Sequence, residues 1–199
     1  MVGTKNEINL AQTGTNNKNI TYQEGAENKA FIEQIGNNLT SKQIQIGSEN
    51  RVVTEFKGTN YRTQTDDAEW SSYQEQIGTK NQSQLLIRNT SPNTNAYTLQ
   101  YGNENKINSE LNEDFNYLYI LQEGTENIVN SETSNGDLNE TFIYQWGNQN
   151  MIGNELKKGV IQSGSLNDVN INQFGNKNSA STSQKGVNNQ VKINQADNQ

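Results

Sequence analysis

Residues 28–50 read NKAFIEQIGNNLTSKQIQIGSEN, and this stretch holds two copies of one pattern. In each copy a glutamine stands two places before a glycine, and the two glycines are 11 residues apart. An asparagine follows each glycine, three places later in the second copy and one and two places later in the first. The same spacing separates Gly3, Gly14, Gly25, Gly36, Gly47 and Gly58, and it returns at Gly164, Gly175 and Gly186. A short unit repeated at a fixed interval predicts a solenoid in which each copy stacks on the next.

Alternation along each unit predicts one β-strand. The positions four and two residues before each glutamine are mostly small or aliphatic, for example Ala30 and Ile32 before Gln34. Apolar residues at every second position indicate a strand with one buried face. The Gly and Asn that follow are expected to supply the positive φ that a tight turn needs. Each 11-residue half-repeat is therefore a strand and a turn, and two half-repeats make one rung of two facing strands.

The predicted fold class is all-β: residues 1–199 form a single domain, a flattened two-sheet β-solenoid of about nine rungs of two strands. Between Gly58 and Gly147 the glycine spacing widens to 20–24 residues, so every second turn is expected to have become a variable loop. TDDAEW, TSPNTN, NEDFN and TSNGD are such loops. Strands are expected to continue between them, as at Ile152–Leu156.

The recurring glutamines are expected to form ladders, because a carboxamide is both a donor and an acceptor and meets the same group one rung above and one below. One sheet is expected to stack Gln12, Gln34, Phe56, Gln76, Gln100, Gln122, Gln145, Gln162 and Gln184. The other ladder residues are Gln23, Gln45, Gln173 and Gln195. The turn glycines are Gly14, Gly25, Gly36, Gly47, Gly78, Gly102, Gly124, Gly147, Gly164, Gly175 and Gly186.

Composition excludes several classes of function. Hydrophobic residues make up only 30%, while the chain holds 35 Asn and 20 Gln, a bias typical of disordered tracts, but disorder would not keep Gln in register with Gly. The absence of His and Cys excludes disulfides, thiolate chemistry and His-assisted nucleophiles. A net charge of −7 with scattered Lys and Arg argues against a nucleic-acid partner, and no apolar run is long enough to span a membrane. We expect no enzyme activity, catalytic residue, metal site or cofactor.

The units NKAFIEQIG, NKNITYQEG and NDVNINQFGNKN resemble the half-repeats of the curlin repeat proteins, N-x-A-x-I-x-Q-x-G-x-x-N, over nearly the whole chain. The resemblance implies a β-solenoid that stacks end to end into an extracellular amyloid fibre of biofilm. Phe56 at a Gln position, Leu39 at an Asn position and Asp197 at a Gly position depart from the pattern. These departures and the irregular middle leave open whether the chain is a major subunit or an accessory nucleator.

The chain ends suggest a partner. Both VGTKN and QADNQ are still in register with the repeat, and neither reads as a capping element, so we expect head-to-tail self-association into a homopolymer. The alternative is a monomeric β-solenoid adhesin that binds matrix polysaccharide. Because the repeat begins at Gly3, no signal peptide is visible, and we favour a secreted chain numbered after processing, with Met1 added.

Outward-facing positions carry a second pattern of large side chains. An apolar ribbon is expected as a lateral interface, either between two filaments or with matrix polysaccharide. Its members are Phe31, Tyr73, Tyr97, Tyr101, Tyr119, Phe142, Tyr144 and Trp146. The alternative is stacking between rungs within one chain. Aligned glutamates, at Glu33, Glu55 and Glu75 on one sheet and at Glu110, Glu132 and Glu155 on the other, predict either repulsion between neighbouring rungs or, as the favoured alternative, a solvated charged face that limits sticking.

Overall fold

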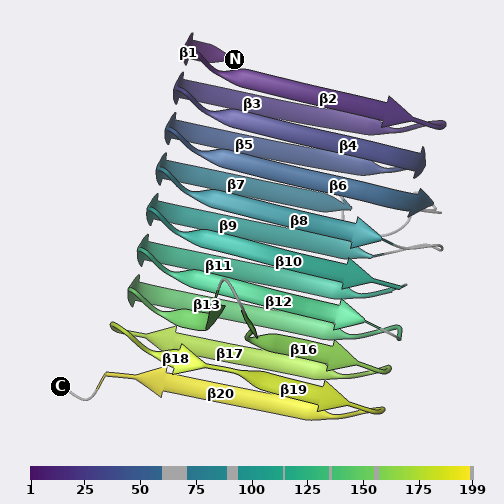
Figure 1. Ribbon diagram of the computed structural model, residues 1–199, viewed down its shortest axis with the longest axis vertical. Helices are drawn as coiled ribbons and strands as arrows, with labels where there is room; N and C mark the ends of the chain where they lie inside the picture. The colour runs from purple at the N-terminus through teal and green to yellow at the C-terminus, as the bar shows by residue number, and fades with distance from the viewer. Residues whose placement is uncertain (60–70, 89–93, 114, 135, 155–156, 198–199) are drawn as a thin grey trace.

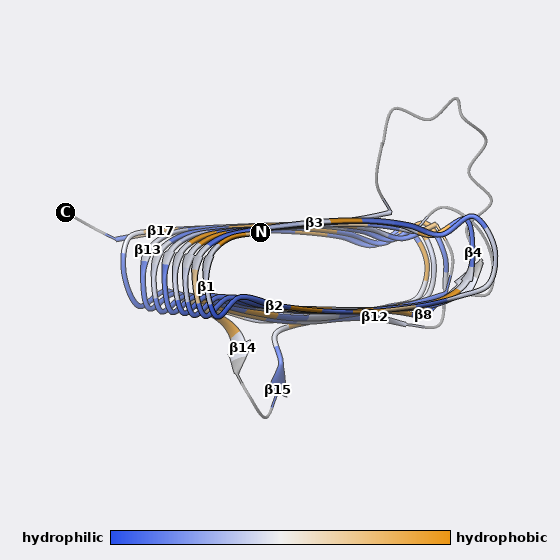
Figure 2. Cartoon of the chain, turned by 90° about the horizontal axis from the view of Figure 1, so that it is seen from above, coloured by the Kyte–Doolittle hydropathy of each residue, from blue (hydrophilic) through white to orange (hydrophobic). Residues whose placement is uncertain are grey.

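A computed structural model describes residues 1–59, 71–88, 94–113, 115–134, 136–154 and 157–197. These residues form strands without any helix, and the strands make two sheets that face each other across a thin interior (Figures 1 and 2). Apart from one small hairpin, every strand pairing between described residues is parallel, as in a coil that climbs by one strand per turn. The predicted all-β, two-sheet solenoid is confirmed.

Sheet A contains nine strands and sheet B contains eight levels, so the chain makes about eight turns where about nine rungs were expected. Sheet A has the order β1 (Val2–Thr4), β3 (Lys18–Ala26), β5 (Thr40–Ser48), β7 (Ser72–Thr79), β9 (Asn95–Asn103), β11 (Tyr117–Thr125), β13 (Glu140–Asn148), β17 (Asp168–Phe174) and β20 (Gln190–Ala196). Sheet B has the order β2 (Glu7–Thr13), β4 (Lys29–Asn37), β6 (Arg51–Thr59), β8 (Gln82–Arg88), β10 (Lys106–Asn112) and β12 (Ile128–Ser134). Its seventh level is shared by β14 (Met151–Asn154) and β16 (Val160–Ser163), and its eighth by β18 (Ser179–Ala180) and β19 (Thr182–Lys185).

Glycine fixes the corners between the sheets, because successive corners touch through their backbones. Gly47 has a φ of +120°, and a β-carbon built on it would lie 2.0 Å from the carbonyl oxygen of Gly78 on the next rung. Neither the dihedral angle nor the space admits a side chain. The second positive φ of each corner falls on the residue before the asparagine, such as Glu49 at 57°. The expectation that the asparagine itself adopts this conformation is therefore wrong.

The prediction that each widened glycine interval is a full rung is wrong for the first of them. β7 follows β6 directly but lies in sheet A, where Gln76 pairs in register with Gln45. The 20 residues from Gly58 to Gly78 are therefore a half-rung with an insertion and not a full rung. The insertion falls on residues 60–70, which lie outside the described ranges, as does most of TSPNTN. Longer connections follow β6, β8 and β12, so they share one edge of the solenoid, whereas the connection between β10 and β11 has the ordinary length.

The predicted continuous strand at Ile152–Leu156 is also wrong. The chain leaves sheet B at Gly153, where β14 turns into an antiparallel contact with β15 (Lys157–Lys158), and this hairpin projects from the sheet (Figure 2). Leu156 lies outside the described residues. β16 then resumes the level, so that Ile152 lies beside Val129 while Val160 lies beside Ser131. The interior face is thus continuous in space although the sequence is interrupted.

The thin interior changes character along the rod. In the N-terminal half it holds a buried polar network: Gln43 Nε2 donates to Thr54 Oγ1 at 3.2 Å, and Gln74 Nε2 donates to Ser83 Oγ at 2.8 Å. Thr54 in turn donates to Gln74, so the buried amides are paired. In the C-terminal half the sheet A side of the interior is mainly aliphatic, with Leu118, Ile120, Ile143 and Ile171 buried, while sheet B keeps buried polar groups such as Ser131 and Thr133. Two of the three departures from the repeat, Leu39 and Phe56, are buried in the same hydrophobic cluster as these aliphatic residues.

Candidate functional site

Sheet A carries one unbroken ladder of glutamines, which we call the sheet A ladder. Its members are Gln23, Gln45, Gln76, Gln100, Gln122, Gln145, Gln173 and Gln195. Every Nε2 except the last donates to the Oε1 of the next glutamine, over 2.7–3.0 Å. All these bonds run in the same direction, toward the C-terminal tip.

A second bond from each amide ties the two sheets together. Gln100 Nε2 donates to the carbonyl oxygen of Gln82 at 3.0 Å, and Gln82 is the first residue of β8 in sheet B. The other ladder glutamines make the same bond to the first residue of the facing strand, as Gln122 does to Lys106 at 3.1 Å. An inner glutamine thus uses both N–H groups and its oxygen while fully buried, which removes the penalty for burying an amide.

The corresponding ladder in sheet B is interrupted. Gln12 donates to Gln34 at 2.5 Å near one tip, and Gln162 donates to Gln184 at 3.3 Å near the other. Between them the same register position is occupied by Phe56, Ile87, Leu111 and Thr133. The expected stack of nine along one sheet is therefore wrong, because its members Gln76, Gln100, Gln122 and Gln145 lie in sheet A. The misassigned half-rung after Gly58 caused the error.

An asparagine ladder at one corner was missed as a site. The motif Q-x-G-x-x-N contained the signal, and stacked asparagines were expected from it, but none was named among the predicted site residues. The backbone N–H of Asn127 donates to Asn105 Oδ1 at 3.0 Å, and Asn105 Nδ2 donates to the carbonyl oxygen of Gly124 at 3.0 Å. The residues in this ladder are Asn6, Asn28, Asn50, Asn81, Asn105, Asn127, Asn150 and Asn178. Each corner is therefore bonded to the next through side chains as well as strands.

The outer surface of sheet A bears an aromatic face. Tyr73, Tyr97, Tyr119 and Phe142 share one register position, and Tyr101 and Trp146 share another, with Tyr144 between. The structure adds two rings that sequence reasoning missed, Tyr117 and Phe174, which contact Phe142 and Trp146 respectively. Phe31 lies on sheet B beside Val53, so its assignment to the same ribbon is wrong.

Stacking along the rod covers much of the ring surface. The rings of Trp146 and Phe174 have centroids 4.8 Å apart and planes 6° apart, so each ring covers a face of the other. Tyr117 and Phe142 are 5.4 Å apart across neighbouring strands. Contacts of this kind are worth about 0.5–1.5 kcal/mol each beyond area burial. The aromatic face therefore stabilises the stack of rungs and offers mainly ring edges to a partner.

Two phenols on this face share one carboxylate. Tyr73 donates to Glu75 Oε2, and Tyr101 donates to Glu75 Oε1 at 3.3 Å. Burial among the neighbouring rings, assisted by Glu75, raises the pKa of Tyr101 to about 12. Burial also raises the pKa of Tyr73, with its hydrogen bond to Glu75 as the next cause. Both phenols stay protonated donors over the ordinary pH range.

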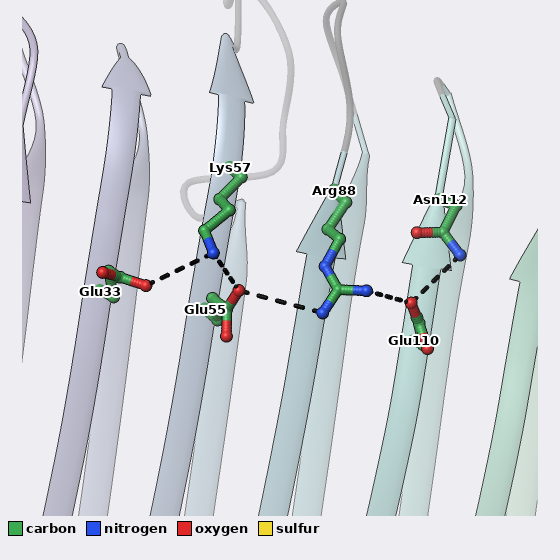
Figure 3. Close-up of polar contacts among 6 residues, drawn as sticks. All are labelled: Glu33, Glu55, Lys57, Arg88, Glu110 and Asn112. Carbon is green, nitrogen blue, oxygen red and sulfur yellow. Dashed lines mark hydrogen bonds and ion pairs between the residues drawn. The ribbon is translucent and has the colours of Figure 1, made fainter.

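Charges alternate on the outer surface of sheet B (Figure 3). Lys57 Nζ lies 2.7 Å from Glu55 and 3.9 Å from Glu33, and Arg88 lies 2.6 Å from Glu110 and 4.0 Å from Glu55. The pKa of Lys57 is raised by its hydrogen bond to Glu55. Cations thus separate these glutamates, and the repulsion that the sequence predicted as one alternative is wrong for them.

The prediction for the other aligned glutamates was also partly wrong. Glu110 and Glu132 occupy the same position of sheet B as Glu33 and Glu55, with Leu86 between the two pairs. Glu75 lies on sheet A, and Glu155 is outside the described residues. Within the described ranges, no group of three or more Asp and Glu is placed to hold a metal ion. No helix in the same ranges is long and apolar enough to cross a membrane.

Comparison with known proteins points to one family. A family model, the curlin associated repeat, matches residues 164–196, the part of the chain that holds β17 to β20. Neither the curated proteins nor the solved structures contain a match to the chain. The matched part has an unbroken 11-residue spacing at Gly164, Gly175 and Gly186. The C-terminal turns of this solenoid are therefore similar to the curlin associated repeat, and the resemblance to the curlin repeat proteins is supported there.

Proposed function

We propose that this chain is a structural subunit of a curli-like extracellular amyloid fibre, which polymerises head-to-tail through the tips of its solenoid and serves biofilm matrix and adhesion. The observation that carries the proposal is the sheet A ladder. It reproduces inside one chain the stacked amides and parallel, in-register strands of cross-β fibrils. A second chain placed on either tip would extend the same arrangement.

The strands at the tips support this contact. In the described part of the chain, β2 pairs with β4 alone and β20 pairs with β17 alone, so each has one edge without a neighbouring strand. The interior is also open at these levels: Leu10 is 47% exposed at one tip, and Ile193 is only half-buried at the other. Two different tips make a heterologous contact, which gives an open filament when it does not close into a ring.

An accessory nucleator is the second candidate. It is favoured by the interrupted sheet B ladder, where Phe56, Ile87, Leu111 and Thr133 replace glutamine in the middle of the rod. A monomeric adhesin that binds polysaccharide has less support, because Trp146 and Phe174 already cover one face of each other. A sugar that stacks on aromatic rings needs a free ring face.

Electron microscopy and sedimentation of the purified 199-residue chain test the proposal. We expect unbranched filaments whose fibre diffraction has a meridional reflection near ~4.8 Å, the spacing of strands along the rod. A stable monomer at high protein concentration would contradict a fibre subunit. Filaments that form only when a trace of this chain is added to another curlin repeat protein would favour the nucleator.

A further inference from the structure

One atom of the sheet A ladder is left without a partner. Gln23 is fully buried, and its Oε1 is a buried polar atom that accepts no hydrogen bond from the described residues. Its Nε2 donates to Gln45 at 2.7 Å and to the carbonyl oxygen of Glu7 at 3.0 Å. Every later ladder oxygen accepts from the rung before it. The residue before Gln23 in this register is Met1, since Val2 pairs with Glu24, and a methionine has no amide to donate.

The same place lacks a strand. β3 is nine residues long, but β1 pairs only with its last three residues, Glu24–Ala26. Along Asn19–Gln23 the edge of β3 that faces away from β5 has no neighbouring strand among the described residues. A buried acceptor and a short length of open strand edge therefore coincide at the N-terminal tip.

The C-terminal tip has the matching features. β20 pairs with β17 over Gln190–Ala196, and its other edge has no neighbouring strand in the described chain. Gln195 accepts from Gln173 at 2.8 Å, but among the residues that the structure describes its Nε2 donates only to the carbonyl oxygen of Ser179. The inner glutamines of the ladder each donate twice, so Gln195 has one N–H left for a further rung.

We propose that a second copy of this chain docks in one fixed register, in which Val191–Gln195 of one copy pair in parallel with Asn19–Gln23 of the next. Gln195 then donates to Gln23 Oε1, and the ladder crosses the junction without a break. This inference rests on the proposed function and adds the residues and the register of the contact. β1 pairs only with Glu24–Ala26, so it keeps its place when the exposed Met1 of the second copy and the exposed Ala196 and Asp197 of the first turn away from the junction.

The strands of sheet B also come into register when the second copy docks in this way. Moving one turn on from β18 and β19 places Ile8 next to Ala180 and Gln12 next to Gln184, by the register that links each level to the next. Gln12 would then accept from Gln184 and continue this ladder too. The exposed Leu10 would face Thr182 and leave solvent.

The corner of the joined rung is also complete. Asp197 stands where a corner glycine is required, so β20 cannot turn into sheet B in the usual way. Residues Val2–Asn6 of the next copy already have that corner: Asn6 Nδ2 donates to the carbonyl oxygens of Val2 and Gly25, both at 3.0 Å. The joined rung would take its strand from one copy and its corner from the other.

Cysteine cross-linking tests the register, because the chain has no cysteine of its own. Tyr22→Cys and Asn194→Cys are made in separate proteins, since both side chains face outward and are exposed, and they would be register neighbours across the junction. Within one chain these positions are seven strands apart in sheet A, about 34 Å at the usual strand spacing. A disulfide between them therefore joins two molecules. The matched control pairs Tyr22→Cys with Lys192→Cys, two residues out of register and about 8 Å away, beyond the reach of a disulfide.

The two variants are mixed, assembled and oxidised, and the reducible dimer is identified by mass spectrometry. We expect the in-register pair to give at least about tenfold more mixed dimer than the control pair or either variant alone. Filaments in which the two pairs cross-link equally would overturn this register while leaving the fibre proposal in place. A chain that forms no filaments and no cross-link would overturn both.

Discussion

Gly164 and Gly186 stack at one corner, and only the first is covered. A β-carbon on Gly164 would lie 2.0 Å from the carbonyl oxygen of Gly186, whereas one on Gly186 would meet nothing nearer than Asn189 Nδ2 at 3.5 Å. Their φ values of +106° and +118° are similar, so strain of about 1–3 kcal/mol applies to both. We expect Gly164→Ala to unfold the last rungs and Gly186→Ala to leave them folded. Circular dichroism and limited proteolysis distinguish the two outcomes.

Gly186→Ala has a further use, because Gly14 of a second copy would cover Gly186 in the proposed junction. The new methyl group would then meet that backbone, so we expect a folded chain that no longer extends filaments, measured by sedimentation. Gly136→Ala is unsuitable as a control, since Gly164 covers it. A Gly186→Ala chain that elongates wild-type seeds at the normal rate would show that this corner is not part of the contact.

Gln100→Leu is expected to be strongly destabilising. The change removes two donated bonds and one accepted bond, and it leaves Gln76 without an acceptor and Gln122 without a donor. Each buried group left unpaired costs about 1–3 kcal/mol, so we expect a loss of several kcal/mol in the free energy of unfolding, measured by denaturant titration.

The matched control is Gln12→Leu. Gln12 holds the same place in its half-repeat but is exposed at the N-terminal tip. We expect this change to cost about 1–3 kcal/mol in a monomeric chain, less than Gln100→Leu, because it removes one bond and leaves only the buried oxygen of Gln34 without a donor. Equal losses for the two variants would mean that the ladder adds nothing beyond the backbone bonds of the strands.

The repeat itself could be predicted from the sequence, and the placement of the middle rungs could not. An 11-residue glycine spacing with apolar residues at every second position leaves little choice besides stacked strands, and the two-sheet solenoid followed. The interval from Gly58 to Gly78 is different, because a half-rung with a long insertion has nearly the length of a full rung. Only strand pairing in space distinguishes the two, and every later glutamine changes sheet with that choice.

Stability should fall at alkaline pH. The pKa of Tyr101 is about 12 in the folded chain and 10.0 in the unfolded one, so the unfolded state loses its proton first. The contribution of this group is therefore complete below pH 10 and is lost as pH rises from 10 toward about 12. Denaturant titrations at several pH values measure the loss, and ultraviolet absorbance of tyrosinate measures the titration directly.

Glu75→Gln serves as the control for this titration. Burial is the largest cause of the raised Tyr101 pKa, and the charge of Glu75 comes after it. The midpoint should therefore move down in the variant but stay above the ordinary value for tyrosine. A wild-type chain whose tyrosines all titrate as in the denatured protein would contradict the buried packing of the aromatic face.

The aromatic face is expected to pair filaments side by side. Replacing Tyr97, Tyr119 and Trp146 with Ser should abolish bundling and leave single filaments, because these rings project from sheet A and not into the interior. Phe31→Ser on sheet B is the matched control and should leave bundles intact. Electron microscopy counts bundles against single filaments. Loss of all filaments in the triple variant would mean that the rings serve only to stack rungs.

The common direction of the sheet A hydrogen bonds makes the rod electrically asymmetric. Each carboxamide is a small dipole, and aligned dipoles add along an axis as they do in a helix. One extremity of an assembled fibre then presents an amide oxygen and the other an amide hydrogen. The two ends of the fibre should therefore add new molecules at unequal rates, and the direction of faster growth would be set by the orientation of the glutamine side chains.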